Sequence, residues 1–129
     1  QKETHPEYWA SATVNLANAL QHVPTSHPEE NLWEAVALYE DVLSVRREED
    51  DPIAYARVLA NQGNALAHLG AFSRAVPRLE AACRRFLAHG EAAAAEAVAD
   101  VLEEIARRQS AVRSNVLRVN GGRREQGGG

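Results

Sequence analysis

The stretch GNALAHLGAFSRAVPRLEAA, residues 63–82, decides the fold class of this chain of 129 residues. Gly70 divides it into two runs, and in each run small residues are interleaved with large apolar ones. Small residues let two helix backbones approach each other, and large residues fill the gaps beside them. Glycine also accepts the backbone conformation that follows the end of many helices. The stretch therefore predicts two packed helices joined by a short turn at Gly70.

An internal repeat extends this pattern toward the N-terminus. Sliding the chain by 46 residues superimposes seven identical residues between positions 6–22 and 52–68, where chance would give roughly one. Further along, the best offset is 40, and the difference is an insertion in HVPTSHPEEN (22–31), whose composition predicts a loop. The identical pairs are Pro6 and Pro52, Ala10 and Ala56, Asn15 and Asn61, Asn18 and Asn64, Ala19 and Ala65, Leu20 and Leu66, and His22 and His68.

Each copy of the repeat reads as two helices, and a fifth helix follows. Pro6 and Pro52 suit a first helical turn, where the missing N–H does no harm, and Asp51 is a natural N-cap. Gly70 and Gly90 are placed to end the third and fourth helices. The expected helices cover residues 6–22, 29–48, 52–69, 72–88 and 91–113, which predicts an all-α fold.

Two features depart from a plain helical pattern. Pro77 in the second turn of the fourth helix is expected to remove one backbone hydrogen bond and to bend that helix. The segment NVLRVNGGRREQGGG (115–129) is rich in Arg and Gly and is expected to form a tail. Its first part, residues 115–119, is expected to dock in an extended form against another surface. The helical domain is therefore expected to comprise residues 1–114.

Composition narrows the class of protein. Hydrophobic residues make up 45% and charged residues 25%, a globular balance, while 24 alanines against 5% aromatic residues favour close-packed helices. Cys83 is the single cysteine, which excludes an internal disulfide framework and favours a reducing, cytoplasmic compartment. No apolar run approaches the ~20 residues that a membrane helix needs. Because residue 1 is Gln and not Met, we expect the chain to be a processed or excised piece.

Charge is distributed unevenly along the chain. Residues 1–56 carry 3 basic and 11 acidic side chains, a net charge of −8, whereas residues 57–129 carry 11 basic and 7 acidic ones, a net charge of +4. The overall charge of −4 argues against a nucleic-acid partner. The late arginines read either as a solvated helix face or as a surface for an acidic partner, including the acidic half of a second copy.

The stretch 63–82 resembles a tetratricopeptide repeat (TPR). In that family a small residue marks the crossing of two helices, a Gly and an aromatic residue mark the turn, and small and apolar residues recur in the second helix. The first copy resembles the pattern less closely, because its inter-helix loop is long. The matching positions are Gly63, Leu66, Gly70, Phe72, Ala75, Leu79 and Ala82 in the second copy, and Ala17, Leu20, Ala35 and Tyr39 in the first.

The spacing of 40–46 residues is longer than the usual ~34. It is similar to that of the longer kinesin-light-chain-like and bacterial CHAT-associated TPR proteins. This resemblance implies a right-handed α-solenoid, with repeat one at about 6–48, repeat two at about 52–89 and a third-repeat or capping helix at about 91–114. It also implies a non-catalytic, cytoplasmic scaffold for protein–protein interactions. The alternative is a sensor, regulatory or oligomerisation domain of a larger bacterial signalling or protease-linked protein.

In TPR proteins the first helices of successive repeats line a concave groove that binds a peptide or a helix. A side-chain amide both donates to and accepts from a peptide backbone, and Asn is a poor residue for a helix interior, so the four Asn residues point to binding. The other interpretation is that they bond neighbouring helices or water. The resemblance implies groove positions for Asn15, Asn18, Gln21, His22, Arg57, Asn61, Asn64 and His68.

Other kinds of site find little support. A chaperone-tail clamp lacks its cations, since Val14, Glu91 and Ala95 stand where the resemblance would place them. The five histidines show no HxxxH spacing, so no metal and no cofactor are expected. Cys83 lies on the apolar side of its helix and is expected to be a buried, inert thiol. The expected partners are a protein or peptide, or a second copy bound through the ends of the solenoid or the tail.

Overall fold

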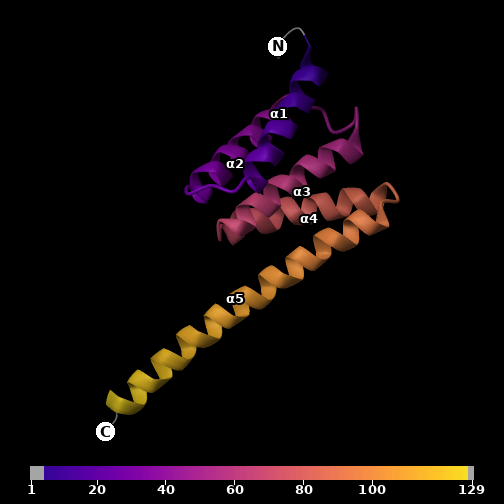
Figure 1. Cartoon of the computed structure of the whole chain (residues 1–129). Coiled ribbons are helices and arrows are strands. Elements are labelled where there is room, and N and C mark those ends of the chain that lie inside the picture. Colours follow the sequence, from indigo (N-terminus) through magenta and orange to yellow (C-terminus); the bar gives the residue numbers. More distant parts are fainter. Residues whose placement is uncertain (1–4, 128–129) are drawn as a thin grey trace.

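The computed structural model describes residues 5–127, and side chains are described up to Arg118. Five helices follow one another, and no strand occurs within residues 5–127, so the predicted all-α class is confirmed (Figure 1). The helices are α1 (Pro6–His22), α2 (Pro28–Val45), α3 (Pro52–His68), α4 (Phe72–Ala88) and α5 (Ala92–Gly127).

Local sequence signals set most of the helix ends. Proline opens α1, α2 and α3, where its missing N–H costs no hydrogen bond. The Asp51 carboxylate accepts a hydrogen bond from the Ala54 backbone N–H at 3.1 Å, and thereby caps α3. Gly70 and Gly90 adopt φ angles of 76° and 74° after α3 and α4, a conformation that disfavours residues with a Cβ atom.

Three expectations about the helices are changed by the structure. α2 ends at Val45 rather than at Glu48. α5 does not end near Arg113 but continues to Gly127, so the extended segment predicted for residues 115–119 is wrong. The physical reason is that no Pro or Gly interrupts residues 92–120, and helix propensity therefore carries α5 onward. Pro77 lies inside α4, which stays one continuous helix around it.

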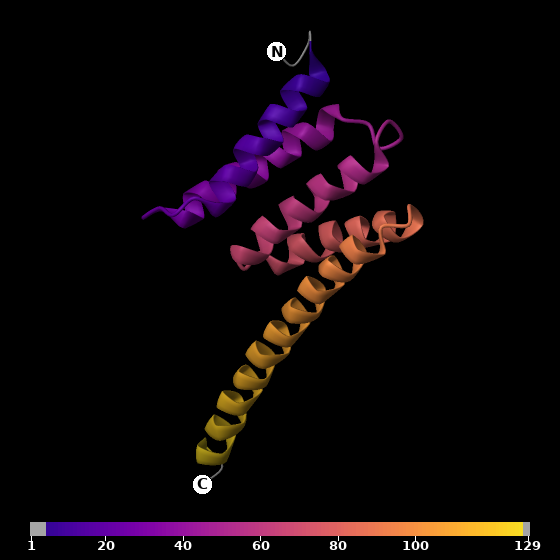
Figure 2. The same cartoon turned by 45° about the vertical axis from the view of Figure 1, so that its right-hand side comes forward.

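Each helix packs mainly against its neighbours in sequence. The most extensive contacts join α3 to α4, α1 to α2, α4 to α5 and α2 to α3, whereas α1–α3 and α3–α5 contacts are few. Consecutive helices run in opposite directions and form a stack (Figures 1 and 2). This order is compatible with a helical repeat.

Small residues allow the helices of each pair to approach closely. Ala17 and Ala35 are fully buried in the first pair, and Ala75 and Ala82 are fully buried in the second. A Cβ atom at Gly63 would lie only 2.6 Å from Cγ of Leu79, so α3 and α4 meet too closely there for any larger residue. The remaining positions expected to pack are buried at Tyr39, Leu66 and Leu79 and half-buried at Leu20 and Phe72.

Arginines of α4 tie the two pairs together. Arg85 makes a two-point ion pair with Glu48, at 2.7 and 3.0 Å, and its guanidinium lies 5.7 Å from the centre of the Tyr55 ring. Arg78 pairs with Glu40 at 3.1 Å. Planar guanidinium groups match carboxylates at two points, so these contacts hold α4 in a defined position against α2 and the connection between α2 and α3.

The second half of α5 extends beyond the body formed by the other helices (Figures 1 and 2). Its first half is anchored by Ala95, Val98 and Ile105, which are buried. Every described residue from Ala106 to Arg118 is exposed. α4 is shorter than α5 and leaves this part of the helix uncovered.

Candidate functional site

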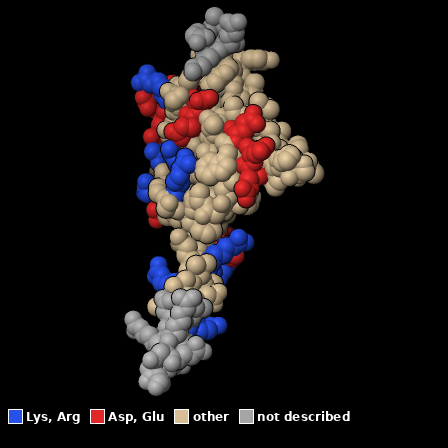
Figure 3. Space-filling view, turned by 90° about the vertical axis from the view of Figure 1, so that its left-hand side faces the viewer, with Lys and Arg blue, Asp and Glu red and all other residues tan. Residues whose placement is uncertain are grey.

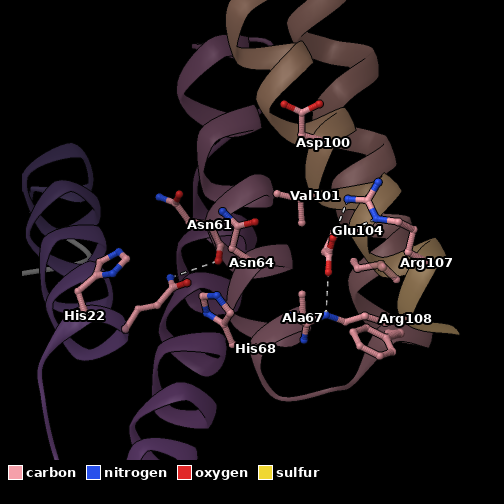
Figure 4. A pocket seen from close by; sticks show the side chains of 13 residues that line it. His22, Asn61, Asn64, Ala67, His68, Asp100, Val101, Glu104, Arg107 and Arg108 are labelled. Atoms are coloured by element: carbon pink, nitrogen blue, oxygen red, sulfur yellow. Dashed lines mark hydrogen bonds and ion pairs between the residues drawn. The ribbon is translucent and has the colours of Figure 1, made fainter. Parts of the chain in front are cut away.

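A depression of about 500 Å³ lies between the end of α1, the second half of α3 and the middle of α5 (Figure 4). We call it the main groove. Most of its lining residues are polar, and apolar ones form patches between them. Its lining residues are Gln21, His22, Asn61, Asn64, Ala67, His68, Phe72, Asp100, Val101, Glu104, Ile105, Arg107 and Arg108.

Most of the residues expected to line a groove are brought together here. Gln21, His22, Asn61, Asn64 and His68 all line the main groove, although they come from two helices that begin 46 residues apart, at Pro6 and Pro52. Figure 4 shows the α1 and α3 side chains facing the space between α1, α3 and α5. A second depression of about 230 Å³ adjoins it, where Arg57 lies with Asn61, Asn64 and Val101.

Asn15 and Asn18 lie outside both depressions. Asn15 is exposed on α1. The Oδ1 atom of Asn18 accepts one hydrogen bond from the Tyr39 hydroxyl and another from Nδ2 of Asn61, at 3.2 Å for the latter. Asn18 therefore joins α1 to α2 and α3, which is the structural role that the sequence left open as the alternative.

Tyr39 is the centre of this polar network. Its ring is fully buried, and Nε2 of Gln21 donates to its hydroxyl at 3.2 Å and lies 3.4 Å from the Asn61 carbonyl oxygen. Burial raises the pKa of the Tyr39 phenol above its ordinary value of 10.0, and the hydrogen bond from Gln21 opposes that shift. The network gives the α1–α3 wall of the groove a fixed shape, because each amide is oriented by its partners.

Asn64 differs from the other groove amides. It is half-buried and lines both depressions, yet its side-chain amide makes no hydrogen bond to any residue that the structure describes. Its donor and acceptor groups are therefore available to a bound molecule. Ala67 and His68 lie beside it on the same helix, and the floor nearby is apolar at Phe72 and Val101.

The α5 wall carries the charge of the groove. The Glu104 carboxylate accepts from Arg107 at 2.6 Å and from Arg108 at 3.2 Å, and these hydrogen bonds hold its pKa below the ordinary value (Figure 4). Asp100 lies one turn earlier along the helix. Along this wall two carboxylates are followed by two guanidinium groups, which face the amides and imidazoles of α1 and α3.

Sequence reasoning did not name the α5 residues of the groove. The sequence predicts only that the fifth helix is a third-repeat or capping helix. A third-repeat helix would continue the surface that α1 and α3 form. The signal was present in the spacing of Asp100, Glu104 and Arg108, which recur every four residues and share a helix face. Their exposure on the groove side depends on how α5 packs against α3 and α4.

Other candidate chemistry is scarce among the described residues. Within residues 5–118 no group of three or more His, Cys, Asp or Glu side chains is arranged to hold a metal ion. Cys83 is half-buried and not fully buried as expected, and its Sγ atom lies 3.7 Å from the Ala95 carbonyl oxygen. Among the described helices, none combines the length and apolar character that a membrane span requires.

Comparison of the chain with protein-family models, with curated proteins and with solved structures finds no match. The TPR resemblance therefore rests on the residues of the chain themselves.

Proposed function

We propose that this chain is a TPR-like, right-handed helical repeat module that binds a peptide or helical segment of a protein partner in the main groove. The observation that carries the proposal is Asn64, a half-buried amide without a described hydrogen-bond partner, set in a depression between α1, α3 and α5. α1 and α3 are the first helices of the two pairs, and α5 follows the second pair. A repeat protein uses such a surface for recognition because each repeat adds one helix to it.

The walls of the groove suit an extended or helical peptide. The side-chain amides of Asn61 and Asn64 offer donors and acceptors that complement a peptide backbone. Phe72, Val101 and Ile105 supply apolar surface for a side chain of the ligand.

Direct selection of ligands tests this proposal. Peptides selected from a displayed random library against the full chain are measured by fluorescence anisotropy against the wild type and Asn64→Ala. Loss of a hydrogen bond to a bound peptide is expected to weaken binding by roughly tenfold, equivalent to about 1–1.5 kcal/mol.

Asn15→Ala is the matched control, because it makes the same chemical change on an exposed helix face outside the groove. It is expected to leave binding unchanged. Asn18→Ala is unsuitable as a binding test, since it breaks hydrogen bonds to Tyr39 and Asn61. Selected peptides that bind wild type and Asn64→Ala equally would place the binding surface elsewhere.

A further inference from the structure

Two apolar helix faces remain uncovered at opposite ends of the helix stack. The first runs along α1, where Tyr8 is 77% exposed and Leu16 is 52% exposed. The second lies on the protruding half of α5, where Val112 is 62% exposed and Val116 is 53% exposed. Exposed apolar faces of this kind mark interaction surfaces in soluble proteins.

The α1 face is a continuous stripe. Its members recur every three or four residues and lie opposite the buried Ala10 and Ala17. The stripe covers sixteen residues, from position 8 to position 23, or about 22 Å at 1.5 Å per residue. We define the α1 stripe as Tyr8, Ala12, Leu16, Ala19 and Val23, all of which are exposed.

The α5 face continues a stripe that is buried in the first half of the helix. Val98 and Ile105 pack against the body, and Val112 follows at the same interval of seven residues, with Val116 one turn later. The apolar spacing thus persists beyond the point where α4 and the α3–α4 turn cover it. We define the α5 stripe as Val112 and Val116, with Leu117 beside them.

The charges that flank the two stripes are opposite in sign. Trp33 and Glu40 of α2 face α4, through Arg74 and Arg78, and Glu30, Glu34 and Asp41 lie roughly a quarter-turn around α2 from them, on its exposed face. None of these three acids forms an ion pair with a described residue. They belong to α2, in the same helical hairpin as the α1 stripe.

The α5 stripe is bordered only by cations. Arg113 and Arg118 are exposed and have no described carboxylate partner, and no acidic residue occurs from position 105 to 124. On the face drawn in Figure 3, the helical body carries acidic side chains together with some basic ones, and the narrow protruding end carries mainly basic side chains. Two α5 stripes laid together would bring like charges into contact, whereas an α5 stripe laid on the α1–α2 hairpin pairs opposite charges.

We infer that the protruding half of α5 of one copy docks on the α1 stripe of a second copy. The contact buries Val112 and Val116 against Leu16 and its neighbours. It places Arg113 and Arg118 near the acidic side of α2. Because the two surfaces differ, the contact is head-to-tail and either closes into a ring or pair or continues as an open chain. The main groove lies elsewhere, so this association does not depend on the proposed function.

The mass of the full chain in solution tests this inference, measured by sedimentation velocity over a concentration series. The wild type is expected to associate, and Leu16→Asp and Val116→Asp are each expected to weaken association by about tenfold or more, because each buries an unpaired charge. Both residues are more than half exposed in the single chain, so each variant keeps its helical circular dichroism. Leu87→Asp on α4, at a residue 63% exposed outside both stripes, is the control expected to change nothing.

Mixing the two impaired variants separates head-to-tail contact from other arrangements. Leu16→Asp keeps an intact α5 stripe and Val116→Asp keeps an intact α1 stripe, so the mixture is expected to form pairs that neither variant forms alone. Added salt is expected to weaken the association, since the flanking charges are exposed. A wild type that stays monomeric at every concentration overturns the inference. Self-association of Leu16→Asp equal to wild type also overturns it, and would assign the contact to two α5 helices.

Discussion

Gly63→Ala tests how the second helix pair is held together. Gly63 is buried in α3, and Leu79 of α4 is fully buried opposite it. The added Cβ atom would lie 2.6 Å from Cγ and 2.7 Å from Cδ2 of Leu79, and 3.4 Å from the Leu79 backbone nitrogen. Carbon atoms in contact prefer a separation of about 3.5–4.0 Å. Either Leu79 or the whole of α4 must therefore move by close to an ångström.

Two effects of opposite sign determine how Gly63→Ala changes the free energy of unfolding. Alanine is favoured over glycine in a helix interior by about 1 kcal/mol. Overpacking a close-packed core costs about 1–3 kcal/mol, and the upper end applies because the clash involves Cγ, which cannot swing away as a side-chain tip can. The expected net loss is about 2 kcal/mol. For a domain of this size, such a loss lowers Tm by roughly 6–8 °C.

Urea denaturation followed by far-ultraviolet circular dichroism measures this loss. Ala37→Gly, at an exposed position within α2, is the matched control and isolates the effect of helix propensity, with an expected cost of about 1 kcal/mol. A variant Gly63→Ala with Leu79→Ala removes the obstructing carbons, so within the Leu79→Ala background the Gly63→Ala change is expected to become stabilising. If Gly63→Ala alone stabilises the chain, the close crossing of α3 and α4 is refuted.

Three further predictions concern the polar contacts. Tyr39→Phe is expected to cost about 1–2 kcal/mol through lost hydrogen bonds. Because the pKa of Tyr39 is raised in the folded chain, its neutral phenol contributes fully to wild-type stability below about pH 10, and this contribution is lost as pH rises through the folded pKa. The Phe variant should lack this loss in urea titrations at alkaline pH. Arg85→Lys is expected to cost about 1 kcal/mol because lysine cannot match Glu48 at two points, whereas Arg47→Lys, in an exposed pair, should be neutral by thermal denaturation. Gln62→Ala is expected to cost about 2 kcal/mol, because its buried Nε2 donates to Val36 O and to a Glu40 carboxylate oxygen; a neutral result in urea denaturation would contradict this.

Much of the helical framework could be predicted because its signals are local. Pro52, Asp51 and Gly70 act on the backbone within a few residues, and the structure places α3 and α4 within one residue of the expected bounds. The predicted end of α5 is wrong because it also relied on a local signal. The run of glycines near the C-terminus was read as a tail beginning at residue 115, although the intervening residues up to Asn120 contain nothing that stops a helix.

The candidate site was less predictable than the fold. The repeat relates Asn18 to Asn64 and Asn15 to Asn61, which predicts the same role for both members of each pair. In the folded chain Asn18 and Asn61 are joined to each other, Asn15 is exposed, and Asn64 faces the groove without a described partner. Residues at the same repeat position therefore have different surroundings, because the first repeat has a neighbour on one side only.

By itself the sequence determined an all-α chain of paired helices, the small residues at their crossings, and the division of charge between an acidic first half and a basic second half. These properties depend on backbone propensities and on a repeating pattern, both of which are visible residue by residue. Only the tertiary structure decided that α5 closes one side of the groove with Glu104, Arg107 and Arg108. It also decided that two apolar stripes remain uncovered at opposite ends of the helix stack. Such outcomes depend on how far each helix overlaps its neighbours, which is a property of packing between distant segments.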